Sequence, residues 1–144
     1  MLAKKTSVRK LIPQEPPMLM VDSLIEHEGA RTLTGFSIEA GNIFVNDGLF
    51  SESGIIENMA QSAALRTGWA GMQKSSNDAN FKPPIGVIGS VKNFKLFRLP
   101  EVNTRLETEI LVQAEVFSAT VIQASVRSDG ELLAEAELKI FIQE

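Results

Sequence analysis

The sequence predicts an α+β fold in which an antiparallel sheet of about six strands wraps around one long helix. Residues 53–72 alone have the length and composition of a long helix. Segments with alternating apolar residues or many β-branched residues precede and follow it, as expected for strands. Because one helix cannot cover both faces of a sheet, a sheet that curls around the helix is the economical way to bury apolar surface. The uncovered sheet face and the sheet edges then favour a dimer.

Two strands are expected before the helix, as a hairpin over residues 18–26 and 31–38. The turn between them is predicted at residues 27–29, which places His27, the only histidine of the chain, in solvent. Residues 1–12 are basic and are expected to form a solvated lead-in to one domain that spans residues 1–144. Residues 41–48 are expected to form an irregular loop.

Beyond the helix, the sequence predicts a polar loop and then a series of strands. The loop covers residues 74–84, and Asp129-Gly130 is a strong signal for a hairpin turn. The strands are expected at residues 85–97, 104–116, 119–127 and 131–142.

The helix is expected to begin after Ser53 as its N-cap and to bury a face of mostly small residues. At about 100° per residue, one sector contains Ile56, Met59, Ala60, Ala63, Ala64, Thr67, Ala70 and Gly71. Asn58, Ser62 and Arg66 fall on the opposite side of the helix. The small-residue sector is therefore predicted to face the sheet.

Composition excludes several kinds of function. The chain has 144 residues, no cysteine and a net charge of -4, so disulfides, thiol catalysis and cysteine metal sites are excluded, and nucleic-acid binding is disfavoured. No apolar run approaches the roughly 20 residues that cross a bilayer, and no apolar signal core follows the basic N-terminus. We therefore expect a cytoplasmic protein that does not bind membranes and uses no metal or other cofactor.

Three segments, in this order, resemble the 3-hydroxyacyl-(acyl-carrier-protein) dehydratase family. They are LIPQEPPMLMVDSLIE (11–26), GIIENMAQSAALRTG (54–68) and IGSVKNFKLFRLPEV (88–102). Each segment is weak evidence alone, but the ordered set spans nearly the whole chain. The resemblance implies a hotdog fold, a dimer as the functional unit, and a tunnel for an acyl-phosphopantetheine chain at the subunit interface.

The family's functional residues map onto this chain only in part. The helix carboxylate corresponds to Glu57, the glutamine one turn later to Gln61, and the arginine of the third segment to Arg98, with Leu99 before the proline. The catalytic histidine of the loop before the helix has no counterpart, and Asn46 or Asp47 stands nearest to it. The sequence is more similar to a divergent, histidine-free branch that is associated with polyene or unusual acyl chains. In the opening motif, Gln14 replaces a second histidine.

Dehydration needs a base for the C2 proton, an acid for the departing C3 hydroxyl and donors for the carbonyl oxygen. Glu57 is the predicted acid–base group, oriented by Gln61. Asp47 can replace the missing histidine as base, or Asn46 can bond the carbonyl. Unpaired backbone amides of Gly54 and Ile55 at the helix N-terminus are predicted to bind the carbonyl oxygen.

The basic residues Lys92, Lys95 and Arg98 fit a docking patch for an acidic carrier protein, or simply an exposed strand face. Three functions stay open from the sequence. The chain is a dehydratase acting on thioesters of acyl-carrier protein or coenzyme A, a hotdog thioesterase that uses a carboxylate, or a non-catalytic acyl-binding subunit. In the last case it would bind acyl chains, or complete the site of a related dehydratase subunit that supplies the histidine. A homodimer or higher oligomer is expected, and a pair with a related dehydratase is the alternative.

Overall fold

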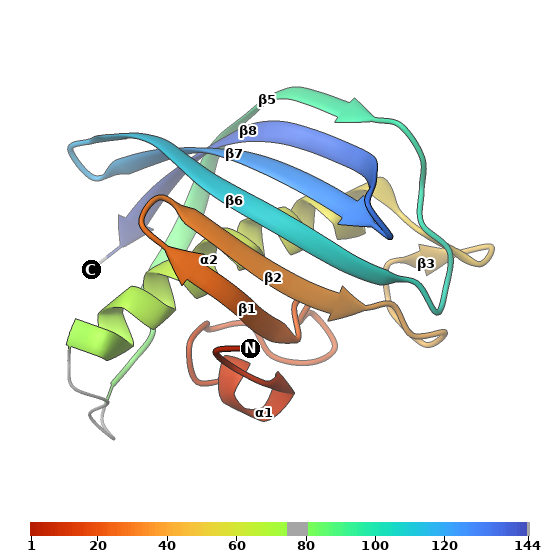
Figure 1. Ribbon diagram of the computed structural model, residues 1–144, viewed down its shortest axis with the longest axis horizontal. Helices are drawn as coiled ribbons and strands as arrows, with labels where there is room; N and C mark the ends of the chain where they lie inside the picture. The colour runs from red at the N-terminus through yellow and green to blue at the C-terminus, as the bar shows by residue number, and fades with distance from the viewer. Residues whose placement is uncertain (75–80, 144) are drawn as a thin grey trace.

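The computed structural model describes residues 1–74 and 81–143, and its main feature is a six-stranded antiparallel sheet (Figure 1). The strand order across the sheet is β1-β2-β6-β7-β8-β5. The strands are β1 (Ser23–Glu28), β2 (Arg31–Ser37), β5 (Ile85–Leu96), β6 (Arg105–Val116), β7 (Ala119–Ser128) and β8 (Glu131–Gln143). A small hairpin of β3 (Val45–Asn46) and β4 (Leu49–Phe50) stands apart from the sheet.

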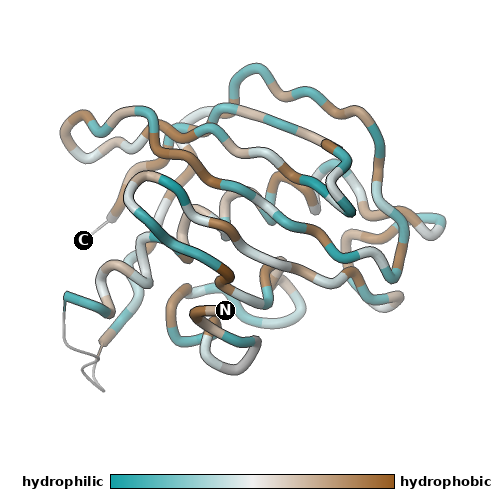
Figure 2. The backbone as a smooth tube through the Cα atoms, in the orientation of Figure 1, coloured by the Kyte–Doolittle hydropathy of each residue, from teal (hydrophilic) through white to brown (hydrophobic). Residues whose placement is uncertain are grey.

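The sheet curves over one long helix, α2 (Glu52–Lys74), which lies against its concave face (Figure 1). Strand residues alternate between hydrophobic and hydrophilic along much of the sheet (Figure 2), because successive side chains point to opposite faces. The inward side chains, among them Leu106, Ile110, Ile122 and Leu138, form the main core with Ile55 and Met59 of α2. The predicted hotdog arrangement of a sheet wrapped around a helix is thus confirmed.

The side of α2 that faces the sheet is not the predicted one. Asn58 and Ser62, predicted to lie opposite the buried face, are fully buried against the sheet. The hydroxyl of Thr108 in β6 donates to Asn58 Oδ1 at 2.6 Å, and the hydroxyls of Ser62 and Thr34 are 2.7 Å apart. These bonds make burial of the polar groups possible. Of the sector that was predicted to be buried, Met59 and Ala63 do lie in the main core, whereas its other members are only half-buried in a single chain.

The N-terminal segment is not a solvated lead-in. Its short helix α1 (Lys5–Val8) is followed by Leu11 and Ile12, which are buried in a second apolar cluster with Leu65 of α2. Ala3 pairs with Leu24 of β1 through backbone hydrogen bonds. The prediction was wrong because it weighed the basic residues of this segment and overlooked the apolar residues between them.

Several boundaries differ from the expectations. The helix is capped by Ser51, whose hydroxyl accepts from Gly54 N at 3.3 Å, and not by Ser53. Strand β1 begins only at Ser23 and runs through His27, so the hairpin turn falls at residues 29–30. The later strands and the turn at Asp129-Gly130 are confirmed within one or two residues.

The predicted loop over residues 74–84 begins with the last residue of α2, and its residues 75–80 lie outside the described part of the chain. No helix in the described ranges has both the length and the apolar character needed to cross a lipid bilayer.

Candidate active site

Glu57 lies in the second turn of α2, at the border between the packed and the half-buried sides of the helix. Its Oε2 accepts a hydrogen bond of 2.9 Å from Nε2 of Gln61, one turn later on the same helix. Within the described residues no partner contacts its other oxygen, Oε1. One oxygen is therefore held by Gln61, and the other has no hydrogen bond within the described residues.

Gln61 is itself fixed by the extended chain before β1. Its Nε2 also donates to the carbonyl of Met18 at 2.8 Å, and its Oε1 accepts from the backbone N–H of Met20. The sequence left two alternatives for Gln61, orienting Glu57 or binding a neighbouring loop. The structure shows that the one amide group does both.

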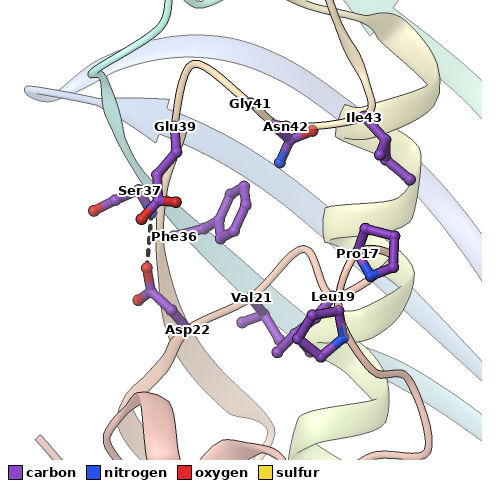
Figure 3. A pocket seen from close by; sticks show the side chains of 11 residues that line it. Pro17, Leu19, Val21, Asp22, Phe36, Ser37, Glu39, Gly41, Asn42 and Ile43 are labelled. Carbon is purple, nitrogen blue, oxygen red and sulfur yellow. Dashed lines mark hydrogen bonds between the residues drawn. The ribbon is translucent and has the colours of Figure 1, made fainter.

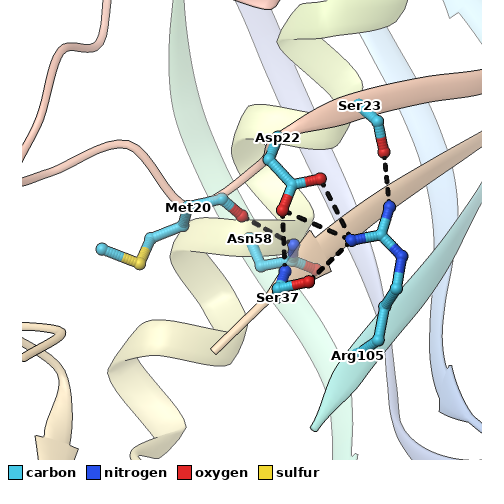
Figure 4. Close-up of polar contacts among 6 residues, drawn as sticks. All are labelled: Met20, Asp22, Ser23, Ser37, Asn58 and Arg105. Atoms are coloured by element: carbon cyan, nitrogen blue, oxygen red, sulfur yellow. Dashed lines mark hydrogen bonds and ion pairs between the residues drawn. The ribbon is translucent and has the colours of Figure 1, made fainter. Parts of the chain in front are cut away.

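The same extended chain is anchored at two further points, which Figure 4 shows. Asn58 Nδ2 donates to the carbonyl of Met20 at 2.8 Å. Asp22 accepts from the backbone N–H of Ser37 at 2.8 Å and pairs with Arg105 of β6 at 3.3 Å. We call residues 18–22 the anchored segment, because Met18 and Met20 are bound to the helix and Asp22 to the sheet.

Arg105 joins three elements at this point (Figure 4). Besides Asp22, its guanidinium donates to the hydroxyls of Ser37 and Ser23, each at 2.8 Å. A Cβ at Gly35 would lie only 2.4 Å from Arg105 Nη2, so glycine leaves the space for this side chain. The ends of β1, β2 and β6 are thus held together beside the anchored segment.

A cleft of about 270 Å³ opens on the outer side of this segment (Figure 3). Pro17, Leu19 and Asp22 form one side of it, and Glu39 and Asn42 of the loop after β2 form the other. None of the residues that line this cleft, among those that the structure describes, is a predicted site residue. The cleft is therefore separate from Glu57 and its partners.

The half-buried side of α2 lies beside β5 and β8. Ala60, Ala64 and Thr67 line a small cavity of about 40 Å³ there, together with Gly86 and Ile88 of β5. Gln14, which stands where the family has a histidine, also lines it, and its buried Oε1 has no hydrogen-bond partner. These residues enclose a small cavity on the half-buried side of the helix, and Glu57 is not among its lining residues.

Asn46 and Asp47 lie in the β3–β4 hairpin, where both side chains are exposed. Asp47 and Gly48 have φ angles of 52° and 78° and form its two-residue turn, which explains the Asp-Gly pair. No hydrogen bond or shared cavity joins Asp47 to Glu57 among the described residues of one chain. A role for either residue in a two-carboxylate site stays a prediction.

The backbone amides of Gly54 and Ile55 are not free, contrary to expectation. Gly54 N donates to the hydroxyl of Ser51, and Ile55 N donates to the carbonyl of Ser51 at 3.1 Å. The helix begins earlier than predicted, so these amides lie deeper in its first turn. A Cβ at Gly54 would lie 2.6 Å from the ring of Phe50, which shows that this glycine serves close packing.

The basic residues of the predicted docking patch lie beside carboxylates of β8. Arg98 makes two hydrogen bonds to Glu131, and this bonding lowers the pKa of Glu131. Lys95 pairs with Glu135 at 4.0 Å, and Lys92 lies opposite Glu137 in the strand register. The three cations therefore lie beside carboxylates of the same sheet, and a role for them in docking a carrier protein stays a prediction.

His27 is also placed differently from the expectation. It is half-buried in β1, and its Nδ1 lies 2.8 Å from the hydroxyl of Thr32. Burial, and then the positive charge of Arg66, lower the pKa of His27. Arg66 is a half-buried residue of α2 whose Nε has no partner within the described structure.

Sequence reasoning missed Asn58, the neighbour of Glu57, and the backbone of Met18 and Met20. The burial of Asn58 could have been predicted from the strands. Thr34 and Thr108 occupy inward positions there and need polar partners. Nothing in the sequence indicates backbone groups as partners of Gln61.

Comparisons with known proteins agree with this architecture. Residues 6–144 match the ApeP-like family, described as ApeP dehydratase. A 3-hydroxyacyl-[acyl-carrier-protein] dehydratase FabZ from Ruminiclostridium cellulolyticum is 31% identical over 141 residues, covering 96% of each chain. A FabZ from Anaeromyxobacter dehalogenans is 30% identical over 137 residues, covering 90% of this chain and 84% of its own.

Solved structures share the fold. A chain of the dehydratase heterocomplex ApeI:P from Xenorhabdus doucetiae superposes with a TM-score of 0.82 at 17% identity, covering 95% of this chain and 91% of its own. A hypothetical thioesterase with coenzyme A from Streptococcus pneumoniae gives a TM-score of 0.65 at 9% identity, with 84% of each chain covered. At these identities the similarity concerns the fold alone.

Proposed function

The chain belongs to the ApeP-like dehydratase family, and we propose that it dehydrates 3-hydroxyacyl thioesters carried by acyl-carrier protein or coenzyme A. The observation that carries this proposal is the state of Glu57. Gln61 holds one of its carboxylate oxygens, and the other oxygen has no partner among the described residues. Ala60 and Ala64, on the half-buried side of the same helix, line a small cavity beside β5. We propose that the acyl chain lies along this side of α2, in a tunnel that a second chain completes.

In the proposed reaction, Glu57 exchanges a proton with the substrate at C2 or at the C3 hydroxyl. Loss of the C2 proton and of the protonated hydroxyl gives a 2-enoyl thioester and water, with no redox change. Asp47 is the proposed second acid–base group and Asn46 a proposed donor to the carbonyl oxygen. Because both residues are exposed in the hairpin, we place them against Glu57 of a second chain.

A dimer is part of this proposal, and β5 supplies its support. The strand forms one edge of the sheet, so its outer backbone groups have no neighbouring strand in one chain. Its Ile85, Val87 and Val91 are exposed, and an exposed apolar edge of this length normally pairs with another chain. The small-residue side of α2 lies next to this edge and is half-buried. A second chain on β5 would cover both surfaces.

The second chain is a copy of this one or a related dehydratase that carries the family histidine. The loop directly before α2, residues 44–51, contains no histidine, which favours a mixed pair, and the ApeI:P neighbour is itself a heterocomplex. We place the protein in the cytoplasm, because its chain contains no cysteine for disulfides and its proposed substrates are metabolic thioesters.

The proposed reaction is tested by incubating the purified protein with 3-hydroxyacyl and with saturated acyl thioesters. Formation of the 2-enoyl thioester from the 3-hydroxyacyl substrate is the expected result. Release of free thiol from either substrate would instead identify a thioesterase. If the protein shows no turnover by itself, but turnover follows when a histidine-bearing dehydratase is added, the protein would be identified as a non-catalytic partner subunit.

The dimer is tested by the mass of the protein in solution. We expect twice the mass of one chain, and Val91→Lys on the β5 edge should shift the population toward the single chain. A matched control is Val116→Lys, which changes a residue that is also exposed and apolar but lies at the end of β6. A wild-type protein that stays a single chain, both alone and with a related dehydratase, would contradict the proposal.

A further inference from the structure

The orientation of the Gln61 amide is determined by the anchored segment. Its NH₂ group faces two acceptors, the carbonyl of Met18 and the carboxylate of Glu57, and its oxygen faces the N–H of Met20. Turning the amide by half a rotation would set its oxygen against two acceptors and its NH₂ against a donor. The backbone of residues 18–20 therefore decides that Glu57 is met by a hydrogen-bond donor.

The position of that backbone depends in turn on Asn58. Asn58 Nδ2 binds the carbonyl of Met20 at 2.8 Å, and both residues are fully buried. Asn58 Oδ1 accepts from Thr108 of β6 at 2.6 Å, which fixes the Asn58 amide in the direction needed to reach Met20. The neighbouring anchor at Asp22 lies two residues further along the chain and is bonded to the sheet rather than to the helix.

We propose that Asn58 is a positioning residue for Glu57, which acts through the carbonyl of Met20 and the amide of Gln61. The inference rests on the proposed function of Glu57. Without the Asn58 bond, the buried carbonyl of Met20 lacks a donor and the segment moves to find one. The backbone groups of Met18 and Met20, two of the three partners of Gln61, then leave their present positions. As a result, the carboxylate of Glu57 is no longer held in a fixed direction.

The kinetic test compares Asn58→Ala with Ser62→Ala. Asn58→Ala removes the bond to Met20, whereas Ser62→Ala removes a buried hydroxyl of the same helix that bonds Thr34 of β2. We expect Asn58→Ala to lower kcat about tenfold or more with KM within about twofold, because small displacements of a reacting group have large kinetic effects. Ser62→Ala should keep kcat within about twofold of wild type, because no bond to the anchored segment is lost.

A second readout does not depend on activity. The side-chain amide of Gln61 gives an NMR signal that can be assigned by its absence in Gln61→Leu. In the wild-type protein both of its N–H groups are bonded, so slow exchange with water is expected. Asn58→Ala should shift this signal and accelerate its exchange, and Ser62→Ala, which breaks the buried bond to Thr34 one turn away, should leave it unchanged.

The two readouts separate this inference from the proposed function. If the wild-type protein dehydrates no 3-hydroxyacyl thioester, the function fails, while the Gln61 signal still decides whether Asn58 controls that amide. An unchanged signal in Asn58→Ala would overturn the inference, and so would an equal loss of kcat in Ser62→Ala. If Asn58→Ala does not fold, Asn58→Ser serves in the same two measurements, because its shorter side chain cannot reach Met20.

Discussion

The two sides of helix α2 differ in how far their residues are buried and hydrogen-bonded within a single chain. The packed side consists of Asn58, Gln61, Ser62, Leu65 and Gly68, all of which are buried. Its polar groups are bonded to the sheet or to the anchored segment, and its apolar groups pack in one of the two cores. The open side consists of Ile56, Ala60, Ala64, Thr67, Ala70 and Gly71, all half-buried.

This difference separates stability from function along a single helix. The packed side holds the helix, whereas the open side leaves a surface for a second chain or an acyl chain. Glu57 stands between the two sides: Gln61 of the packed side holds it, and Ala60 and Ala64 of the open side follow it along the helix. Substitutions on the packed side should therefore reduce folding stability, and equivalent substitutions on the open side should not.

Gly68→Ala should have the largest effect on stability. A Cβ at this position would lie 1.9 Å from the carbonyl oxygen of Leu11, a backbone atom that cannot move without displacing the N-terminal segment. We expect a loss of about 2–4 kcal/mol in the free energy of unfolding, measured by urea denaturation.

Gly71→Ala on the open side is the matched control. Its Cβ would lie 3.1 Å from the ring of Phe81, which needs to shift only slightly. The unfolding free energy should change by less than about 1 kcal/mol, because the better helix propensity of alanine offsets the contact. Equal losses in the two glycine variants would show that the two sides do not differ.

Ser62→Ala should have a smaller effect. It leaves the buried hydroxyl of Thr34 without its partner, and an unsatisfied buried polar group costs about 1–3 kcal/mol. Thr67→Ala on the open side removes a hydroxyl that bonds only a carbonyl of its own helix, at 3.4 Å, so a change within about 0.5 kcal/mol is expected. Thermal unfolding of both variants distinguishes these outcomes, and a larger loss for Thr67→Ala would reverse the assignment of the two sides.

The pH dependence through His27 should be the smallest effect. Burial and the charge of Arg66 lower the pKa of His27 below 6.5, so the unfolded chain binds a proton more readily than the folded one. Stability should therefore be complete above about pH 6.5 and decline as the pH falls toward the folded pKa. Urea denaturation above and below this pH should show a weaker decline for His27→Gln, and an identical decline would exclude His27 as its source.

Most of the sheet follows from local patterns in the sequence. The buried residues Ala134, Ala136, Leu138 and Ile140 alternate with Glu135, Glu137 and Lys139. Asp129-Gly130 adopts the positive φ angles that such a pair favours. The same signal at Asp47-Gly48 marks the β3–β4 hairpin, which was expected as an irregular loop. Here the strands have two residues each, too few to show any alternation.

The orientation of α2 does not follow from its own sequence. An amphipathic pattern assumes that polar residues face water, but Asn58 and Ser62 find partners in Thr108 and Thr34, far away in the chain. For the same reason the sequence identifies Glu57 and Gln61 through family resemblance, but not the backbone groups that hold them. Those contacts depend on how the extended residues 18–22 cross the helix.

The central claim is that Glu57 carries out proton transfer in a dehydration, and Glu57→Gln tests it most directly. The measurement is the rate of 2-enoyl thioester formation from a 3-hydroxyacyl thioester by equal amounts of folded wild-type and variant protein. The account predicts a loss of about a hundredfold or more, with an unchanged melting temperature. A variant that forms the product at the wild-type rate would contradict it.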